Sequence, residues 1–314
     1  MMLGKTAGGL FWMFRYLERS ENTARLLDAG FRIALTRSQS AEDEWASVVT
    51  TAGAKQTYAE KYDQFTATNV IDFLLRDTSN PSSVISVIEA ARNNARLVRT
   101  ALTREVWEAV NESWMTLKAL LASPVREREL PDALGTIRQQ SALVRGALHG
   151  TMLRNDIYDF SRLGTFLERA DNTARILDVK YYVLLPSVSF VGSSLDNVQW
   201  ETILRSVSAQ RCYRWLNEGD ANPMGIADFL ILDRRLPRSL AFCYSRIVDN
   251  LNYLADDYGV RQACHDQAEA VYQQLKGNSI EALFDSGLHE FIEGFIRDNT
   301  ALGAQIEQDF RFYG

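Results

Sequence analysis

A phrase of thirteen residues occurs twice in this chain, at 16–28 and at 166–178, 150 positions apart. Burial alone explains why a Leu or an Ala is retained in both copies, because apolar side chains fill a core. It does not explain why acidic, basic and amide side chains are retained at fixed spacing. The repeat therefore indicates a polar site or network to which each copy contributes. The nine identical positions are Leu17/Leu167, Glu18/Glu168, Arg19/Arg169, Asn22/Asn172, Thr23/Thr173, Ala24/Ala174, Arg25/Arg175, Leu27/Leu177 and Asp28/Asp178.

Further landmarks follow the phrase in the same order in both halves of the chain. Trp45 matches Trp200 at an offset of 155, and the segment 72–83 matches 228–239 at an offset of 156. Matched landmarks in matched order are typical of tandem duplication. A weaker third copy of the pattern, at 89–96, ends in Arg96. We therefore expect two helical halves, 1–150 and 151–314, packed as one body with pseudo-two-fold symmetry.

Apolar residues recur at three- and four-residue spacing in nearly every segment, which predicts an all-α multi-helix bundle. Asn80 before Pro81 predicts a helix that begins at the proline, and 185–196 is expected to form a loop. The long helices are expected at 6–37, 81–110, 132–150, 155–184, 237–258 and 279–309. Shorter ones are expected at 43–53, 68–76, 111–122, 197–216, 225–232 and 263–275.

The polar residues of the phrase share one face of a helix that advances 100° per residue. One interpretation is an amphipathic helix with this face in water. The segment 10–14 just upstream is apolar on every side, however, which predicts that the helix is already buried where the phrase begins. Buried carboxylates and guanidinium groups must pair with one another or with a ligand. A ligand site and a purely structural network of arginines and carboxylates both remain open.

Two copies of one apolar face bury each other well, so we expect the helices 6–37 and 155–184 to pack together in the core. Arg96 and the turns at Ser83 and Ser239 are expected to close the rim of a shared cleft. Simple helix capping is the favoured interpretation of these two helix starts, and anion binding is the alternative. Arg238 beside Ser239 strengthens the anion interpretation in the second half only, because position 82 is a Ser in the first half. The candidate ligand- or partner-binding residues are Glu18, Arg19, Asn22, Arg25, Asp28, Arg96, Glu168, Arg169, Asn172, Arg175, Asp178, Arg238 and Ser239.

Composition and motif content exclude several classes of protein. The net charge of −6 argues against nucleic-acid binding, which requires a basic excess. Three cysteines without CxxC spacing and three scattered histidines predict no metal site, and we expect no cofactor. No segment approaches the roughly 18 apolar residues of a membrane span, so we expect no membrane association and a cytoplasmic location. No nucleophile elbow is present, and catalytic residues cannot be assigned.

Motifs spread over nearly the whole chain form a specific set, at 10–19, 22–25, 73–83, 91–96, 107–111 and 154–169. With these motifs the chain resembles the bacterial alpha-E domain family, a helical domain with a Glu-Arg motif. The resemblance implies a companion of circularly permuted ATP-grasp ligases, in some relatives fused to the ligase in the same chain. It also implies an association with transglutaminase-like or proteasome-like hydrolases.

Two functions follow as expectations. The first is a helical partner or substrate-binding component, not catalytic alone, in an ATP-grasp-linked system that synthesises or modifies peptides. Its substrate would be a peptide or an amino acid. The second is a helical transferase or ligase-type enzyme with the repeated stripe as its active site. That alternative uses Glu18 or Glu168 as general base and requires a carboxylate with a raised pKa in a closed pocket.

Overall fold

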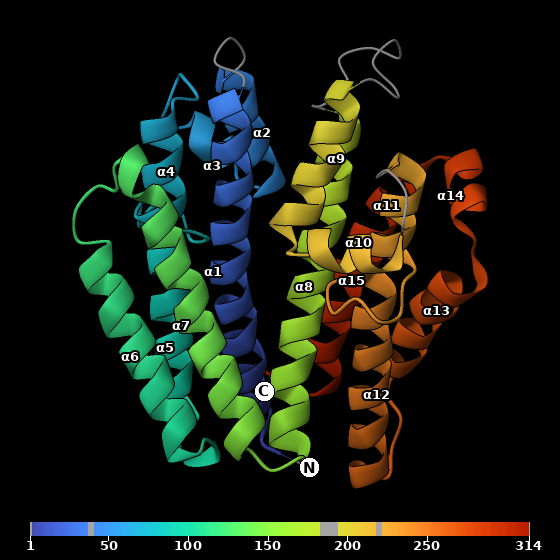
Figure 1. Cartoon of the computed structure of the whole chain (residues 1–314). Helices are drawn as coiled ribbons and strands as arrows, with labels where there is room; N and C mark the ends of the chain where they lie inside the picture. Colours follow the sequence, from blue (N-terminus) through green and yellow to red (C-terminus); the bar gives the residue numbers. More distant parts are fainter. Residues whose placement is uncertain (1, 37–40, 183–193, 218–221, 314) are drawn as a thin grey trace.

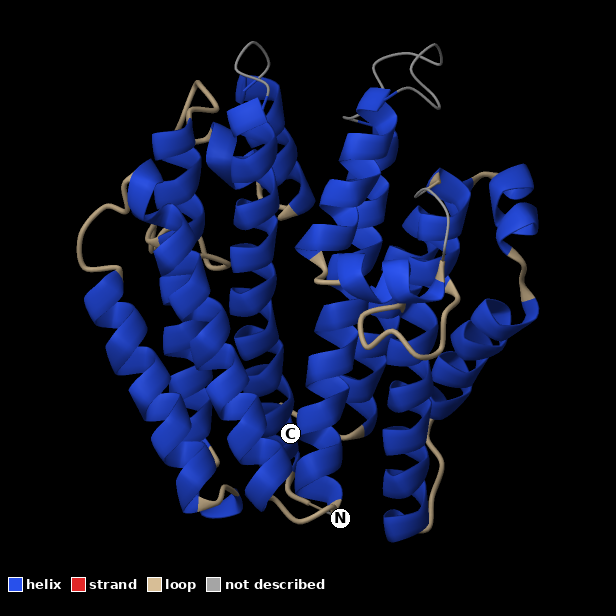
Figure 2. Ribbon diagram, viewed as in Figure 1, coloured by secondary structure: helices blue, strands red, loops and turns tan. Residues whose placement is uncertain are grey.

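The described part of the chain is built from α-helices and short 3-10 turns and contains no strand (Figure 2). The computed structural model describes residues 2–36, 41–182, 194–217 and 222–313. The predicted all-α fold is confirmed. In the first half of the chain the helices are α1 (Gly4–Thr36), α2 (Ala41–Thr51), α3 (Lys55–Ala59), α4 (Ala67–Leu75), α5 (Val84–Leu97), α6 (Arg104–Leu120) and α7 (Leu130–Thr151). They are followed by α8 (Asp156–Tyr182), α9 (Ser194–Ser206), α10 (Gln210–Leu216), α11 (Pro223–Ile231), α12 (Leu240–Tyr258), α13 (Ala263–Gly277), α14 (Ile280–Ser286) and α15 (Leu288–Asp309).

Helix α1 runs through the middle of the molecule and packs along α8 (Figure 1). It also contacts α5 and α7, and α8 contacts α12 and α15 on its other side. Leu10, Phe11 and Met13 are fully buried, as the apolar segment before the phrase predicts. The two helices approach closely at Gly164, where a Cβ atom would lie 2.1 Å from the carbonyl oxygen of Phe11. The predicted packing of the two phrase-bearing helices in the core is confirmed.

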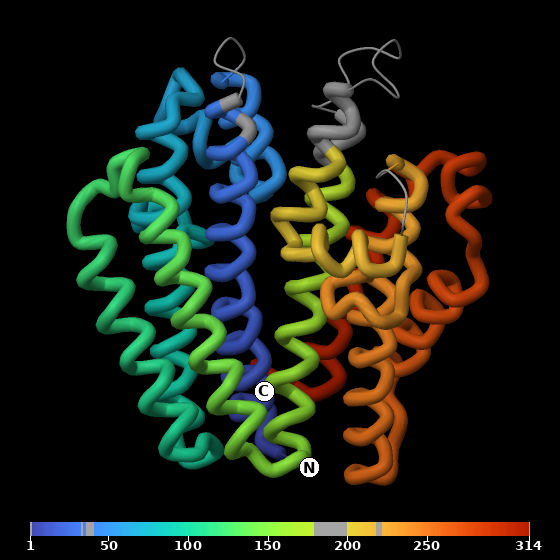
Figure 3. The backbone as a smooth tube through the Cα atoms, in the orientation of Figure 1, coloured from blue at the N-terminus to red at the C-terminus, as the bar shows by residue number. Residues whose placement is uncertain are grey.

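The buried apolar side chains form two clusters, and α1 contributes to both. One cluster draws on helices from α1 to α7, and the other on α1 and on helices from α8 to α15. Figure 3 shows the two groups of helices on either side of the α1–α8 contact. The matched tryptophans Trp45 and Trp200 each have 3% exposed surface and belong to different clusters. The two-fold relation between the halves stays a prediction.

The matched turns before α5 and α12 have the same local construction. Asp77 and Asp233 each accept a hydrogen bond from the backbone N–H two residues later. Ser83 and Ser239 are N-caps, and each side chain accepts from the N–H three residues on. The expectation of a helix start at Pro81 is therefore wrong by three residues. Asn80 instead donates to the carbonyl of Phe73, at 3.1 Å, and stabilises the turn.

Three expected helices are broken in the structure. The helix expected at 81–110 ends at Leu97, and α6 begins after Thr103, whose hydroxyl caps it. Residues 111–120 of the helix expected at 111–122 therefore belong to α6. The helix expected at 279–309 is divided by Gly287, which has a φ of 99°. The one expected at 197–216 is divided near Ser208, with a φ of 57°. Most of the expected loop at 185–196 lies outside the described residues. Within the described ranges, no helix combines the length and apolar character that a membrane span needs.

Candidate functional site

The two copies of the phrase meet face to face through crossed pairs of Glu and Arg. Arg169 on α8 donates two hydrogen bonds to the carboxylate of Glu18 on α1, at 2.9 and 2.8 Å. Arg19 donates to both oxygens of Glu168, at 2.5 and 2.9 Å. Each Glu-Arg dipeptide thus supplies a carboxylate to one pair and a guanidinium to the other. Paired geometry of this kind gives strong, orientation-specific hydrogen bonds.

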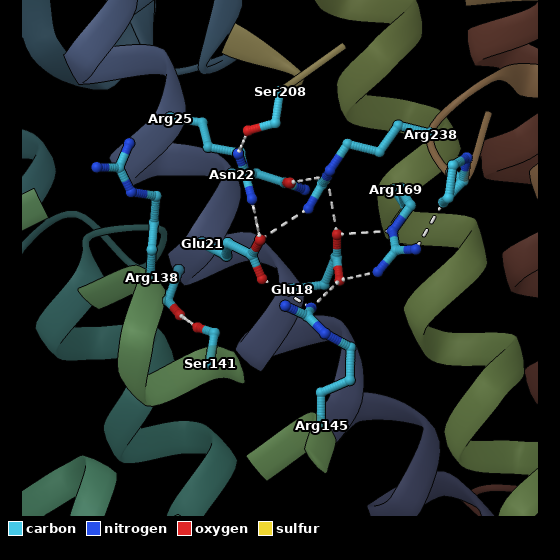
Figure 4. A network of polar contacts seen from close by, with 12 residues as sticks. Glu18, Glu21, Asn22, Arg25, Arg138, Ser141, Arg145, Arg169, Ser208 and Arg238 are labelled. Atoms are coloured by element: carbon cyan, nitrogen blue, oxygen red, sulfur yellow. Dashed lines mark hydrogen bonds and ion pairs between the residues drawn. The ribbon is translucent and has the colours of Figure 1, made fainter. Parts of the chain in front are cut away.

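The carboxylate of Glu18 lies at the centre of a larger buried network (Figure 4). Arg238 contacts Glu18 at 3.0 Å and Glu21 at 2.9 Å. Arg145 contacts the other oxygen of Glu21 at 2.8 Å. Arg25 donates to Glu21 as well, at 3.0 and 2.6 Å. The structural network of arginines and carboxylates, one of the two open interpretations, is therefore present on this side of the contact.

The turn that carries Arg238 is held against α8 by two residues of the second phrase. Arg169 donates to the carbonyl of Pro237, at 3.2 Å, and the hydroxyl of Thr173 donates to the carbonyl of Arg238, at 2.8 Å. Ser239 caps α12, and the guanidinium of Arg238 is occupied by Glu18 and Glu21. The capping interpretation of this helix start is therefore confirmed, and the anion alternative is not supported, because Arg238 points at carboxylates.

Burial and ion pairing act in opposite directions on the glutamates, and ion pairing prevails. Burial raises the pKa of Glu168, but the ion pairs with Arg19 and Arg15 lower it by more than burial raises it, and the resulting pKa is about 2. Burial likewise raises the pKa of Glu18, and Arg169 and Arg238 together hold it well below its ordinary value. A general base for the enzymatic alternative needs a raised pKa. Neither glutamate has a raised pKa, which argues against the role of general base.

A cavity of about 240 Å³ lies beside the Glu168 pair, between α1 and α8. The side chains of Arg19 and Arg175 are 26% and 36% exposed, so the cavity is accessible from solvent at their ends. Its acidic groups are already paired: Glu168 with Arg19, and Asp171 with Arg175 at 2.7 Å. The lining residues are Arg19, Asn22, Thr23, Leu26, Thr51, Ala52, Gly53, Ala54, Leu74, Ser82, Glu168, Asp171, Asn172 and Arg175.

Two amide groups in the cavity wall have unused hydrogen-bonding capacity. The buried Nδ2 atoms of Asn22 and Asn172 have no hydrogen-bond partner. Arg238 donates to the Oδ1 of Asn22 at 3.0 Å, which fixes the orientation of that amide. A buried donor without an acceptor costs about 1–3 kcal/mol. Groups of this kind in a cavity wall are suited to a polar ligand.

The structure brings together nine of the thirteen candidate residues and separates the other four. Arg25 pairs with Glu21 and Ser208 in the network. Asp28 binds Arg32 and Arg138, and Asp178 binds His289. Arg96 is exposed in the last turn of α5 and does not line the cavity, so its expected place at the rim is wrong. The nine that meet are Glu18, Arg19, Asn22, Arg25, Glu168, Arg169, Asn172, Arg175 and Arg238.

Several lining residues were not predicted from the sequence. Asp171 matches Glu21 in the repeat, but the two residues differ, so this position is not among the candidate residues. Ser82, rather than its neighbour Ser83, reaches the cavity. The turn 51–54 lies close to Arg175 on α8: a Cβ atom at Gly53, which has a φ of 70°, would lie 3.3 Å from the guanidinium of Arg175. A glycine between two helices indicates a turn, but nothing in the sequence places this turn against α8.

Comparisons with known proteins identify a family. Residues 2–310 match the Alpha-E family, described as a predicted alpha-helical domain with a conserved ER motif. Uncharacterized proteins of Mycobacterium bovis and Mycobacterium tuberculosis are each 21% identical over 264 residues, covering 80% of this chain and 30% of the relative. The chain thus spans under a third of the length of these relatives. No solved structure matches the chain. Among the described residues, no group of His, Cys, Asp or Glu side chains is arranged to hold a metal ion.

Proposed function

Because the chain belongs to the Alpha-E family, and its two Glu-Arg dipeptides meet beside a polar cavity, we propose a non-catalytic binding function. The protein would hold a peptide or amino-acid substrate for an ATP-grasp ligase in a system that synthesises or modifies peptides. The ligase as partner follows from the resemblance of the sequence to alpha-E proteins. Transglutaminase-like or proteasome-like hydrolases and a cytoplasmic location belong to the same proposal.

The single observation that carries the proposal is the cavity between the two phrases. Two residues of its wall carry amide donors without acceptors. Buried donors in an ordinary protein core are almost always hydrogen-bonded, because an unpaired one lowers stability. At the same time the carboxylates of the cavity are held in ion pairs with arginines. A site with unused binding groups and ion-paired acids supports recognition better than proton transfer.

An ATP-grasp ligase joins a carboxylate to an amine through an acyl phosphate, and it must bring two substrates together. A helical component with its own polar cavity could present one of them. The much greater length of the mycobacterial relatives fits a domain that works beside other segments. The enzymatic alternative, a transferase or ligase acting alone, would need a base other than Glu18 and Glu168.

The test is physical association with the ligase encoded in the same system. Purified protein and ligase, mixed at micromolar concentration, should co-elute from a size-exclusion column. The ligase mixed with an unrelated helical protein of similar mass is the control. Two separate peaks for the cognate mixture, with both proteins folded, would contradict the partnership.

A further inference from the structure

The turn before α5 and the turn before α12 match in sequence but differ at one position that decides what fills the space beside each phrase. At the offset of 156, Ser82 stands where the second half has Arg238. The guanidinium of Arg238 lies against Glu18, Glu21 and Asn22 of the first phrase. Ser82 lines the cavity instead. One half of the protein therefore has a buried guanidinium at this place, and the other half has a cavity.

The cavity presents the same kinds of groups that surround Arg238. Glu168, Asp171 and Asn172 line it, and in the repeat they match Glu18, Glu21 and Asn22. The residues of the first phrase hold the guanidinium of Arg238. The matching residues of the second phrase line the cavity, next to the short side chain of Ser82. A volume of about 240 Å³ corresponds to roughly eight waters at about 30 Å³ each. This is ample for a guanidinium group and the chain that carries it.

The balance of charge also permits a cation in the cavity. Around Glu18 and Glu21, four arginines are gathered: Arg25, Arg145, Arg169 and Arg238. Around Glu168 and Asp171 there are three, namely Arg15, Arg19 and Arg175. One further cation beside the second pair of acids gives it the same ratio that the first pair already has. The first network demonstrates that this ratio is tolerated in a buried setting.

We propose that the cavity binds the guanidinium group of a ligand, an arginine side chain or free arginine, in the place that Arg238 fills in the other half. The ligand's guanidinium would donate to Glu168, Asp171 and the Oδ1 of Asn172. Planar donors of this shape match carboxylates in a two-pronged geometry that a lysine ammonium cannot reproduce. This inference rests on the proposed binding function and specifies its ligand.

Methylguanidinium and L-arginine are the probes, titrated at millimolar concentration, far below the molar range in which guanidinium unfolds proteins. The readout is the shift of the side-chain amide resonances of Asn172 in nitrogen-15 NMR spectra. Both probes should give saturable shifts, with L-arginine the tighter, whereas methylammonium and acetate should bind at least about tenfold more weakly. Saturation by acetate, with no response to methylguanidinium, would overturn the proposal. The protein is used alone, so failure here is distinct from failure to co-elute with a ligase.

Two variants test the exchange between Ser82 and Arg238. Ser82→Arg should fill the cavity with its own guanidinium and weaken probe binding at least about tenfold. Ser123→Arg, on an exposed turn away from the cavity, is the matched control and should bind as the wild type does. Equal affinity in these two variants would refute the assignment. Arg238→Ser should open a second cavity, and methylguanidinium should raise its melting temperature by more than that of the wild type. If Arg238→Ser does not fold, the Ser82→Arg comparison decides.

Discussion

Replacing Glu18 with Gln should cost much more stability than replacing Glu168 with Gln, although the two glutamates occupy matching positions in the repeated phrase. The difference lies in the arginines that each substitution leaves behind. Glu18 pairs with Arg169 and Arg238, whose side chains are each 8% exposed. Glu168 pairs with Arg15 and Arg19, which are 17% and 26% exposed. Water can therefore reach the second pair of arginines much more easily than the first.

The magnitudes follow from that difference in exposure. Removing one partner of a buried ion pair costs about 3–5 kcal/mol, because the remaining charge is left uncompensated. We expect a loss in this range for Glu18→Gln. When the remaining charge can be partly hydrated the loss is nearer the roughly 1–3 kcal/mol of a broken charged hydrogen bond. We expect this smaller loss for Glu168→Gln.

The assay is urea unfolding followed by far-ultraviolet circular dichroism, with the free energy of unfolding extrapolated to water. Glu89→Gln is the matched control, since Glu89 belongs to the weaker third copy of the pattern and is exposed on α5. It should change the unfolding free energy by less than about 0.5 kcal/mol. Equal losses for Glu18→Gln and Glu168→Gln, or a Glu18→Gln variant as stable as the control, would refute this reasoning.

Two further predictions concern α8. Burial and then Asp257 raise the pKa of the Asp159 carboxyl from 3.8 to about 7; between these values the folded state binds more protons than the unfolded state, so stability should fall as pH rises from about 4 to about 7. In urea titrations, Asp159→Asn should therefore be more stable than the wild type by about 4 kcal/mol near pH 8, since one pKa unit corresponds to about 1.4 kcal/mol, and equally stable near pH 4. An unchanged difference across this range would contradict the assignment. Gly164→Ala should lower the melting temperature by several degrees, because its Cβ would meet the carbonyl oxygen of Phe11. Gly146→Ala, with open space around its Cβ, should be neutral or slightly stabilising, and similar behaviour of the two alanine variants would count against the close helix contact.

The central helix pair could be predicted because burial leaves a clear trace in sequence. An apolar segment at 10–14, followed by a polar phrase that recurs, requires a helix that is covered on all sides and meets its copy. The crossed pairing of the two Glu-Arg dipeptides could not be predicted. Which arginine reaches which glutamate depends on how the two helices are rotated about their axes, and the contact at Gly164 sets that rotation.

The errors in the candidate site have a common cause. Arg96 ends the third copy of the pattern, and Ser239 lies next to Arg238 in the matched turn, so the sequence predicts both at the site. The surface to which a side chain points depends, however, on the packing of its helix. Arg96 lies on the exposed side of α5, and the hydroxyl of Ser239 caps the N-terminus of α12. Local backbone conformations, such as the positive φ of Gly287, likewise divide helices without interrupting their apolar periodicity. The lining of the cavity by the turn 51–54 depends on tertiary contact alone.

The ion pairs that hold the two helices together lie beside the cavity that we propose as a ligand site, and the two can be perturbed separately. The most direct test measures two quantities, the unfolding free energy and the dissociation constant for methylguanidinium, in Glu18→Gln and Ser82→Arg. Glu18 does not line the cavity, so its substitution should lower stability and leave the dissociation constant within about twofold of wild type. Ser82→Arg should have an unfolding free energy equal to or higher than that of the wild type and should bind methylguanidinium much more weakly. If stability and affinity fall together in both variants, the pairs and the cavity are one structural unit and the separation is wrong.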